Sequence, residues 1–251
     1  MNAETSTSTI AVLRTEARLF RREPGALFWI LVFPTGLLCV LGVVAGFRTH
    51  KADLGGFSVI DLFVPVSVLV SMTLAAVQLM PQVVLAYREA GVLRRLQTTP
   101  VRPSSLLGAQ VLLHGGTVVL ASALVLAVGR LAFGTPLPHS WAGYVLAYVL
   151  AIIAAFSVGA LVTALSPNTR AGAAASTVVV FPMLFTAGVY MPVQAMPHLL
   201  RVFVDLSPLG AASEAMTESM AGHFPDVGHL LVVALWAGGL SLISVRRFRW
   251  E

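Results

Sequence analysis

The sequence predicts an all-α membrane protein with six membrane-spanning helices. Of its 251 residues, 57% are hydrophobic and 11% are charged, against roughly 45–50% and 25% in soluble domains. The mean hydropathy is +0.86, and the apolar residues gather into six runs of about the 20 residues that a spanning helix needs. A soluble core cannot bury so much apolar surface, so lipid is the expected solvent.

Residues 1–25 are expected to form a polar cytoplasmic tail followed by an amphipathic helix. The stretch TIAVLRTEARLFRRE places Leu13, Ala17 and Phe20 on one helical face. The other faces carry four arginines: Arg14, Arg18, Arg21 and Arg22. Such a helix lies in the inner membrane interface, although a soluble cap that only orients the protein is an alternative. The segment lacks the build of a cleavable signal peptide, so we expect it to be retained.

Residues 26–251 are predicted to form one domain of six spans, delimited by charges, prolines and glycines. Prolines inside a span are tolerated because neighbouring helices can satisfy the freed carbonyl groups. The predicted spans are Ala26–Phe47, Asp61–Ala86, Leu106–Val128, Ser140–Leu165, Gly172–Tyr190 and Val227–Val245.

The distribution of basic residues predicts the orientation of these spans. Six spans place both termini on one side, and that side would hold twelve of the sixteen basic residues. Lysine and arginine are enriched in cytoplasmic loops, so we expect both termini to be cytoplasmic. The net charge of +5 then reflects attraction to anionic membrane lipid, and no nucleic-acid partner is predicted.

The polar stretch YREAGVLRRLQTTPVRPSS separates the second and third spans on the cytoplasmic side. Val92, Leu93 and Leu96 form a small apolar face, and Pro100 and Pro103 prevent the helix from continuing. A short, rigidly ended amphipathic helix suits docking into a groove of a soluble partner. The residues alone equally allow a simple connector that anchors to lipid headgroups.

The outer segment between the fifth and sixth spans, residues 191–225, is too apolar for an ordinary loop. Two helical pieces, Pro197–Asp205 and Leu209–Met220, flank a break at Ser207 and Pro208. Each piece is too short to cross a bilayer, so we expect re-entrant or surface-lying helices.

Four isolated polar groups are candidates for function, and each has a simpler interpretation. We expect Asp61 to be a solvated carboxylate at a helix start, and His114 to bond a neighbouring carbonyl group. Glu214 and Glu218 share one helical face and are expected to be solvated, with a gate or a cation site as the alternative. The sequence predicts no metal site and no catalytic residue, because no histidine cluster or paired carboxylates lie at matching depth.

Small and flexible residues suggest two further contacts. Gly42 and Gly46 form a G-x-x-x-G pair that would permit close helix contact across a dimer, or packing within one subunit. Met183, Phe185 and Met191 are candidates for an adaptable apolar substrate path, with ordinary packing as the alternative.

The sequence does not predict an ATP site in this chain. No G-x-x-x-x-G-K-[ST] motif occurs, and Lys51 is the sole lysine, so the chain is not expected to act as an enzyme by itself. A gradient-driven carrier would need ionisable residues near the midplane and usually an internal repeat, and neither is evident. Energy from a partner is therefore favoured over a gradient.

The run from Arg88 to Val101 resembles the signature of ABC type-2 exporter permeases, roughly R-E-x-G-T-L-R-R-L-x-x-T-P-[VL]. Val92 replaces the usual threonine. LRTEARLFRREPGALFW resembles the family's connecting helix, and TAGVYMPVQAMPHLLRVFVDLSPLGAASEAM resembles its segment after span five. The resemblance covers essentially the whole chain and is nearest to the daunorubicin-resistance type. The signature residues that match are Arg88, Glu89, Gly91, Leu93, Arg94, Arg95, Leu96, Thr99, Pro100 and Val101.

This resemblance implies a permease in a bacterial cell membrane, working as a homodimer or with a close paralogue. A separate cytoplasmic ATPase subunit would bind ATP and Mg, and a coupling helix at about 88–104 would contact it through the matched residues, together with the connecting helix. The implied activity is outward transport of a hydrophobic or amphipathic small molecule, drug or lipid, as in antibiotic resistance and multidrug efflux. Export of a polysaccharide or peptide antibiotic is the alternative, which the aromatic content of 8% weakly disfavours.

Overall fold

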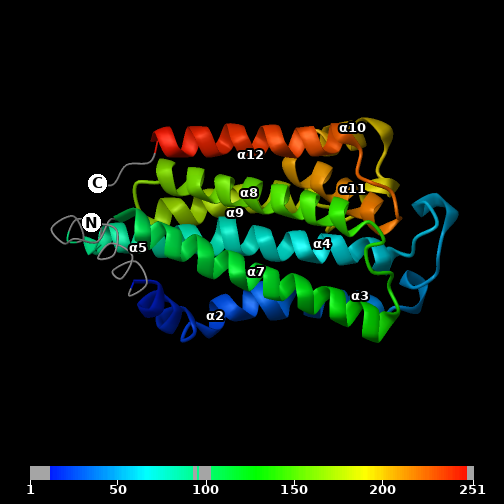
Figure 1. Ribbon diagram of the computed structural model, residues 1–251, viewed down its shortest axis with the longest axis horizontal. Helices are drawn as coiled ribbons and strands as arrows, with labels where there is room; N and C mark the ends of the chain where they lie inside the picture. Colours follow the sequence, from blue (N-terminus) through cyan, green and yellow to red (C-terminus); the bar gives the residue numbers. More distant parts are fainter. Residues whose placement is uncertain (1–11, 93–94, 96–102, 248–251) are drawn as a thin grey trace.

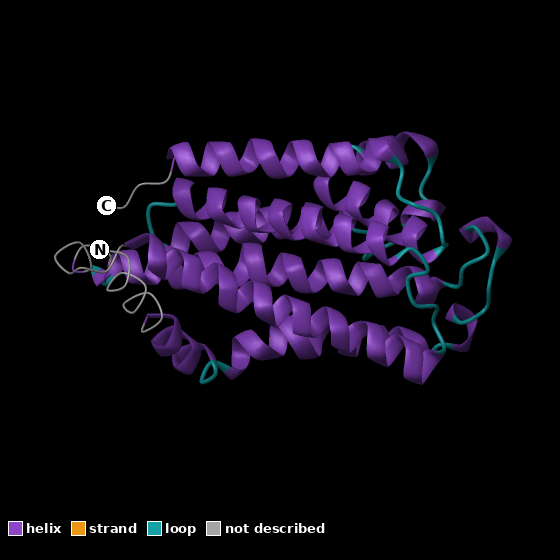
Figure 2. Ribbon diagram, in the orientation of Figure 1, coloured by secondary structure: helices purple, strands orange, loops and turns teal. Residues whose placement is uncertain are grey.

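The computed structural model describes residues 12–92, 95 and 103–247. Helices connected by loops, without a strand, make up this part of the chain (Figure 2). The long helices run side by side along the long axis (Figure 1), and the helix over residues 12–20 lies at the same end as the last residues of α12 (Val227–Arg247).

Six helical segments are long and apolar enough to cross a membrane, which confirms the six predicted spans. The first span is built from α2 (Pro24–Leu27), η1 (Phe28–Val32) and α3 (Phe33–Val43), and the second from α4 (Val59–Thr73), η4 (Leu74–Leu79) and α5 (Met80–Glu89). The others are α7 (Pro103–Phe133), α8 (Trp141–Leu165), α9 (Thr169–Thr186) and α12. Short 3₁₀ turns occupy loops at η2 (Ala45–Phe47), η3 (Ala52–Leu54) and η5 (Val193–Ala195).

Two of these spans contain a π-helical segment that ends two residues before a proline. Proline has no N–H and leaves a carbonyl of the preceding turn without its helical partner. The chain widens at both places: the Phe33 N–H donates to the Phe28 carbonyl, and the Met80 N–H donates to that of Ala75, each five residues back. Pro34 and Pro81 follow directly, so proline explains why η1 and η4 depart from α geometry.

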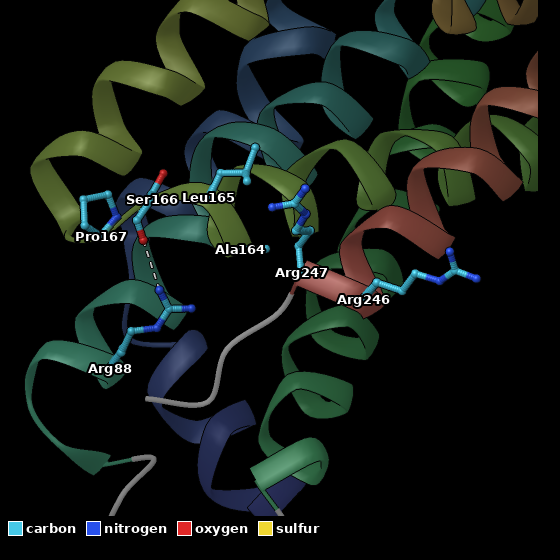
Figure 3. Close-up of a pocket in the computed structure, with 7 residues that line it drawn as sticks. All are labelled: Arg88, Ala164, Leu165, Ser166, Pro167, Arg246 and Arg247. Atoms are coloured by element: carbon cyan, nitrogen blue, oxygen red, sulfur yellow. Dashed lines mark hydrogen bonds between the residues drawn. The ribbon is translucent and has the colours of Figure 1, made fainter.

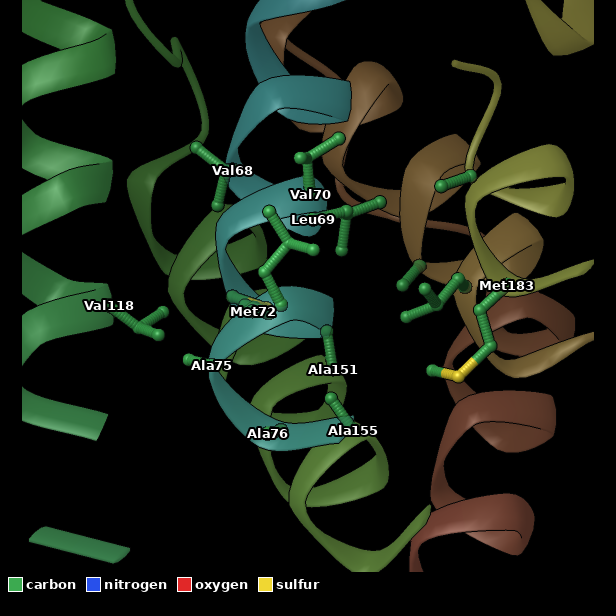
Figure 4. Packing of buried hydrophobic residues seen from close by; sticks show 14 of the residues in the cluster. Val68, Leu69, Val70, Met72, Ala75, Ala76, Val118, Ala151, Ala155 and Met183 are labelled. Carbon is green, nitrogen blue, oxygen red and sulfur yellow. The ribbon is translucent and has the colours of Figure 1, made fainter. Parts of the chain in front are cut away.

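The second span forms the centre of the bundle. Its most apolar stretch is 94% buried, whereas no other span exceeds 44%. Figure 4 shows Leu69 and Met72 of this span packed among side chains from other helices. Gly159 of α8 permits the closest approach, because a Cβ there would lie 1.8 Å from the Ala76 carbonyl oxygen.

The two outer helices lie where the sequence predicts them. α10 spans His198–Asp205 and α11 spans Pro208–Met220. Two local features start α11 as a separate helix. The Ser207 hydroxyl caps it by accepting a hydrogen bond from the Gly210 N–H at 3.1 Å, and Pro208 occupies its first turn. α11 is almost wholly buried, against α8 and α12.

The prediction that both outer glutamates are solvated is wrong for Glu214. Its side chain is only 7% exposed and lies 3.6 Å from the Arg201 guanidinium, while Gln194 donates a hydrogen bond to it at 3.1 Å. Burial raises the pKa of Glu214, and the positive charge of Arg201 opposes that rise. Glu218 is less buried and lies 3.1 Å from His229 of α12. The carboxylates therefore connect α11 to its neighbours.

The prediction of a solvated Asp61 is also wrong, although its place at a helix start is correct. Asp61 is 4% exposed and forms a reciprocal capping box with Ser58 at the start of α4. His114 behaves as predicted, since its Nδ1 donates to the Gln110 carbonyl at 3.0 Å.

Candidate functional site

A buried carboxylate fastens the N-terminal helix to the second and third spans. Glu16 is 8% exposed. The Tyr87 hydroxyl of α5 donates to Glu16 Oε2 at 2.8 Å, and Gln110 Nε2 of α7 donates to the same oxygen at 2.6 Å. Desolvation by burial raises the pKa of Glu16, although the two hydrogen bonds oppose the rise. Tyr87 and Gln110 lie on either side of the predicted coupling segment in the chain, so one carboxylate holds both of its ends.

The apolar face of this helix packs beside that carboxylate. Phe20 is buried and meets the His114 ring edge-on, with ring centroids 4.9 Å apart. The four arginines of the predicted interfacial helix are all exposed: Arg14, Arg18, Arg21 and Arg22. Glu16 is not among the residues predicted from the sequence, although its position four residues before Phe20 places it on the buried face.

Arg88 and Glu89 tie the end of α5 to the turn between α8 and α9. The Arg88 guanidinium donates to the carbonyl oxygens of Ser166 and Thr163 at 3.0 and 3.3 Å. The Glu89 carboxylate accepts from the Thr169 N–H at 2.8 Å and from its hydroxyl. The cation thus meets the carbonyl end of α8 and the anion meets the N–H end of α9, which is the favourable polarity at both helix ends.

Within the predicted coupling segment of about 88–104, Gly91 lies two residues after the last residue of α5. Its φ of +68° lies in the left-handed region that glycine adopts without strain. Arg95 is exposed and donates to the Ala90 carbonyl at 3.1 Å. Five further residues of this prediction lie outside the described residues: Leu93, Arg94, Leu96, Thr99 and Pro100.

An apolar groove of about 420 Å³ lies between the first, second and fifth spans. Both π-helical segments contribute to it, so the proline-induced widening occurs where the groove forms. Two glutamines and Thr177 supply polar side-chain atoms, and exposed Trp29 and Phe181 contribute to its walls. The residues that line it are Trp29, Leu74, Gln78, Leu79, Gln82, Thr177, Val180 and Phe181.

The predicted substrate path does not line this groove. Met183 is buried in the main core (Figure 4). Phe185 and Met191 pack against a separate small cluster that contains Val193 and Met196. All three therefore make packing contacts in this structure, and their place in a substrate path stays a prediction.

Gly42 and Gly46, the predicted G-x-x-x-G pair, lie in different surroundings. A Cβ at Gly42 would lie 2.3 Å from the Phe133 ring of α7 and 2.7 Å from Ile60, so its close contact is within the chain. Gly46 is exposed and meets nothing within 4 Å. A contact of Gly46 with a second subunit stays a prediction.

Glu16, Arg88 and Glu89 bond to other helices and form no reactive centre among the described residues. Among the described residues, no three His, Cys, Asp or Glu side chains are grouped to hold a metal ion. Buried or charge-assisted hydrogen bonds join residues 12–20, α5, α7 and the α8–α9 turn at one end of the bundle. A displacement of one of these segments can therefore be transmitted to the others.

Comparison with known proteins gives two matches. Residues 7–221 match the sequence model of a family described as ABC-2 type transporter. A stretch of 154 residues is 31% identical to a daunorubicin resistance ABC transporter permease protein of Streptomyces coeruleorubidus, and covers 57% of this chain and 52% of that protein. The match therefore spans about half the length of this relative.

Proposed function

The chain belongs to the ABC-2 type transporter family, and we propose that it is the membrane permease of an exporter for hydrophobic or amphipathic small molecules. Six spans in a bundle provide the membrane pathway. A separate cytoplasmic ATPase subunit supplies the energy, and two permease copies or close paralogues assemble with it. ATP and Mg are bound by that partner, in keeping with the missing P-loop lysine.

The groove between the first, second and fifth spans is the observation that carries the proposed cargo class. Aliphatic and aromatic side chains dominate its lining, and Gln78 and Gln82 add hydrogen-bonding groups. Small-molecule sites typically combine apolar walls with few placed polar groups. A drug or lipid with a large apolar surface suits this lining better than a polysaccharide, which needs many polar partners. The name of the Streptomyces relative makes daunorubicin the first compound to test.

The hydrogen bonds around the coupling segment support the proposed route of energy transfer. Glu16 holds the ends of the second and third spans, and Arg88 and Glu89 hold the α8–α9 turn. An ATPase that moves the coupling segment would therefore displace the helix over residues 12–20, α5, α7 and the α8–α9 turn together. Transport by such a device needs rigid links of this kind.

The proposal is tested by reconstituting the chain with its cognate ATPase in lipid vesicles. Daunorubicin is expected to stimulate ATP hydrolysis, and a soluble oligosaccharide of similar mass is expected to have no effect. Equal daunorubicin transport by vesicles that lack the ATPase would contradict the proposal and favour a gradient-driven carrier. Stimulation by the oligosaccharide alone would contradict the apolar cargo.

A double substitution tests the coupling segment in the same vesicles. Leu93→Asp with Leu96→Asp places charges on the predicted docking face, so drug-stimulated hydrolysis should be lost while membrane insertion persists. Leu137→Asp is the matched control, since this exposed leucine lies in the loop between α7 and α8 at the opposite end of the bundle. Undiminished transport by the double variant would remove the coupling assignment.

A further inference from the structure

A pocket rich in arginine opens at the end of the bundle that carries the N-terminal helix (Figure 3). It has a volume of about 520 Å³ and lies between the end of α5, the α8–α9 turn and the last turn of α12. No acidic side chain occurs among the described residues that line it. The residues that line it are Arg88, Ala164, Leu165, Ser166, Pro167, Arg246 and Arg247.

The positive charges of this pocket are positioned in two ways. Arg88 is held at one wall by the carbonyl groups of α8, and Figure 3 shows its bond to Ser166. Arg246 and Arg247 are exposed in the last turn of α12, where the helix dipole stabilises cations. Figure 3 shows the side chains of Arg88 and Arg247 on two sides of the hollow and that of Arg246 pointing away from them. Each guanidinium group is a planar set of N–H donors that matches the oxygens of a phosphate group.

A second hollow lies farther along the same two helices, on the side away from this end of the bundle. This groove of about 330 Å³ is lined mainly by apolar side chains of α7, α8 and α12. Ala160 in the groove lies one helical turn from Ala164 in the arginine pocket, and Ser244 lies one turn from Arg247. The charged pocket and the apolar groove therefore follow one another along the α8–α12 contact.

The size, charge and apolar continuation point to one kind of ligand. A free phosphate would use the arginines and leave the groove without a role. A phospholipid uses both, with its headgroup at the membrane surface and an acyl chain along the helices. Basic pockets between spans on the cytoplasmic side are suited to anionic headgroups.

We propose that an anionic phospholipid of the inner leaflet binds here, with its phosphate between Arg88 and Arg247 and an acyl chain in the groove beside Ala160. The bound lipid stabilises the junction of α5, α8 and α12. Because Arg88 also starts the matched family signature, the lipid would lie against the proposed coupling segment. This lipid site is separate from the cargo groove between the first, second and fifth spans.

The lipid site is tested on the purified full chain in detergent, without the ATPase, so its outcome is independent of the exporter proposal. Phosphatidylglycerol is titrated and the bound lipid is counted by native mass spectrometry. Arg247→Gln should weaken binding about fivefold, since one basic residue near the surface contributes about 1 kcal/mol and 1.4 kcal/mol is tenfold. Arg170→Gln is the matched control, because Arg170 is exposed at the start of α9 and does not line the pocket.

Two further measurements separate the sources of the phosphate. Ala160→Phe fills the apolar groove, and it should weaken phosphatidylglycerol binding while a short-chain glycerophosphate binds as before. Inorganic phosphate at the same concentration should leave the lipid bound. The proposal is overturned if Arg170→Gln weakens binding as much as Arg247→Gln, if phosphatidylcholine binds equally well, or if inorganic phosphate displaces the lipid.

Discussion

Glu16 shows how a single side chain can determine the position of an entire helix. Its Oε2 accepts two hydrogen bonds from residues 71 and 94 positions away in the chain. The exposed arginines of the same helix make it basic at the surface, while the buried carboxylate fixes which face meets the bundle. The position of the helix therefore depends on these two hydrogen bonds as well as on the amphipathic pattern.

Removal of that carboxylate should loosen the helix and weaken energy coupling. Glu16→Ala leaves the Tyr87 hydroxyl and the Gln110 amide without their acceptor, and each buried unpaired group costs about 1–3 kcal/mol. We expect a lower unfolding temperature in detergent and a reduced ratio of drug-stimulated to basal ATP hydrolysis. Glu23→Ala is the control, because Glu23 is exposed just beyond the same helix. Equal losses in both variants would show that charge, and not the contact, matters.

The protonation of Glu16 should appear in the pH dependence of stability. Burial raises its pKa in the folded chain above the ordinary value of 4.5, so folding favours the protonated form. The stabilising contribution is therefore complete below pH 4.5 and is lost as the pH rises through the raised pKa. Glu16→Gln stays neutral, so its unfolding temperature should fall less than that of the native chain over this interval. Parallel curves for the two proteins would contradict the assignment.

At the scale of helices, the adjacent residues Arg88 and Glu89 place opposite charges at the ends of two different helices. Arg88 satisfies carbonyl groups where α8 ends, and Glu89 satisfies N–H groups where α9 begins. Exchange of the two charges would place each against a helix end of the same sign. The order Arg-Glu in the signature therefore has a physical reason that the sequence alone does not show.

The close packing of α8 against the second span at Gly159 can be tested by substitution. Gly159→Ala would put a methyl group within 1.8 Å of the Ala76 carbonyl oxygen, so α8 must move away from the central span. Overpacking of this kind costs about 1–3 kcal/mol, and a lower unfolding temperature in detergent would be the observable result. Gly116→Ala in α7 is the matched control, because nothing lies within 4 Å of its Cβ position. Similar unfolding temperatures for the two variants would contradict the packing argument.

The elements that could be predicted from sequence are those whose signals are local. Hydropathy predicted the six spans, and the Ser207-Pro208 pair predicted the break between α10 and α11. The hydrogen-bond and ion-pair partners of Glu16 and Glu214 could not be predicted, because they come from other elements. The π-helical segments could be predicted only in part. Pro34 and Pro81 mark where they occur, but the groove that they line forms only when three spans are placed together.

Across the whole molecule, the polar contacts of Glu16, Arg88 and Glu89 and the apolar groove involve different sets of residues. The contacts of Glu16, Arg88 and Glu89 gather at the end that carries residues 12–20 (Figure 1). The groove is lined by residues of η1, η4, α5 and α9. In the proposed exporter, energy therefore enters at one end, and the second span, which carries both Tyr87 and Gln78, links that end to the cargo groove.

Occlusion of the groove tests this division of the molecule. Thr177→Trp fills a groove position on α9, and drug-stimulated ATP hydrolysis should require a roughly tenfold higher drug concentration, as a loss of about 1.4 kcal/mol implies. Basal hydrolysis should persist, because the contacts at the end of the bundle are unchanged. Val178→Trp is the matched control: the adjacent Val178 is 72% exposed and does not line the groove. A normal drug response in Thr177→Trp would remove the groove from the transport path, whereas loss of basal hydrolysis would show that groove and coupling contacts are one unit.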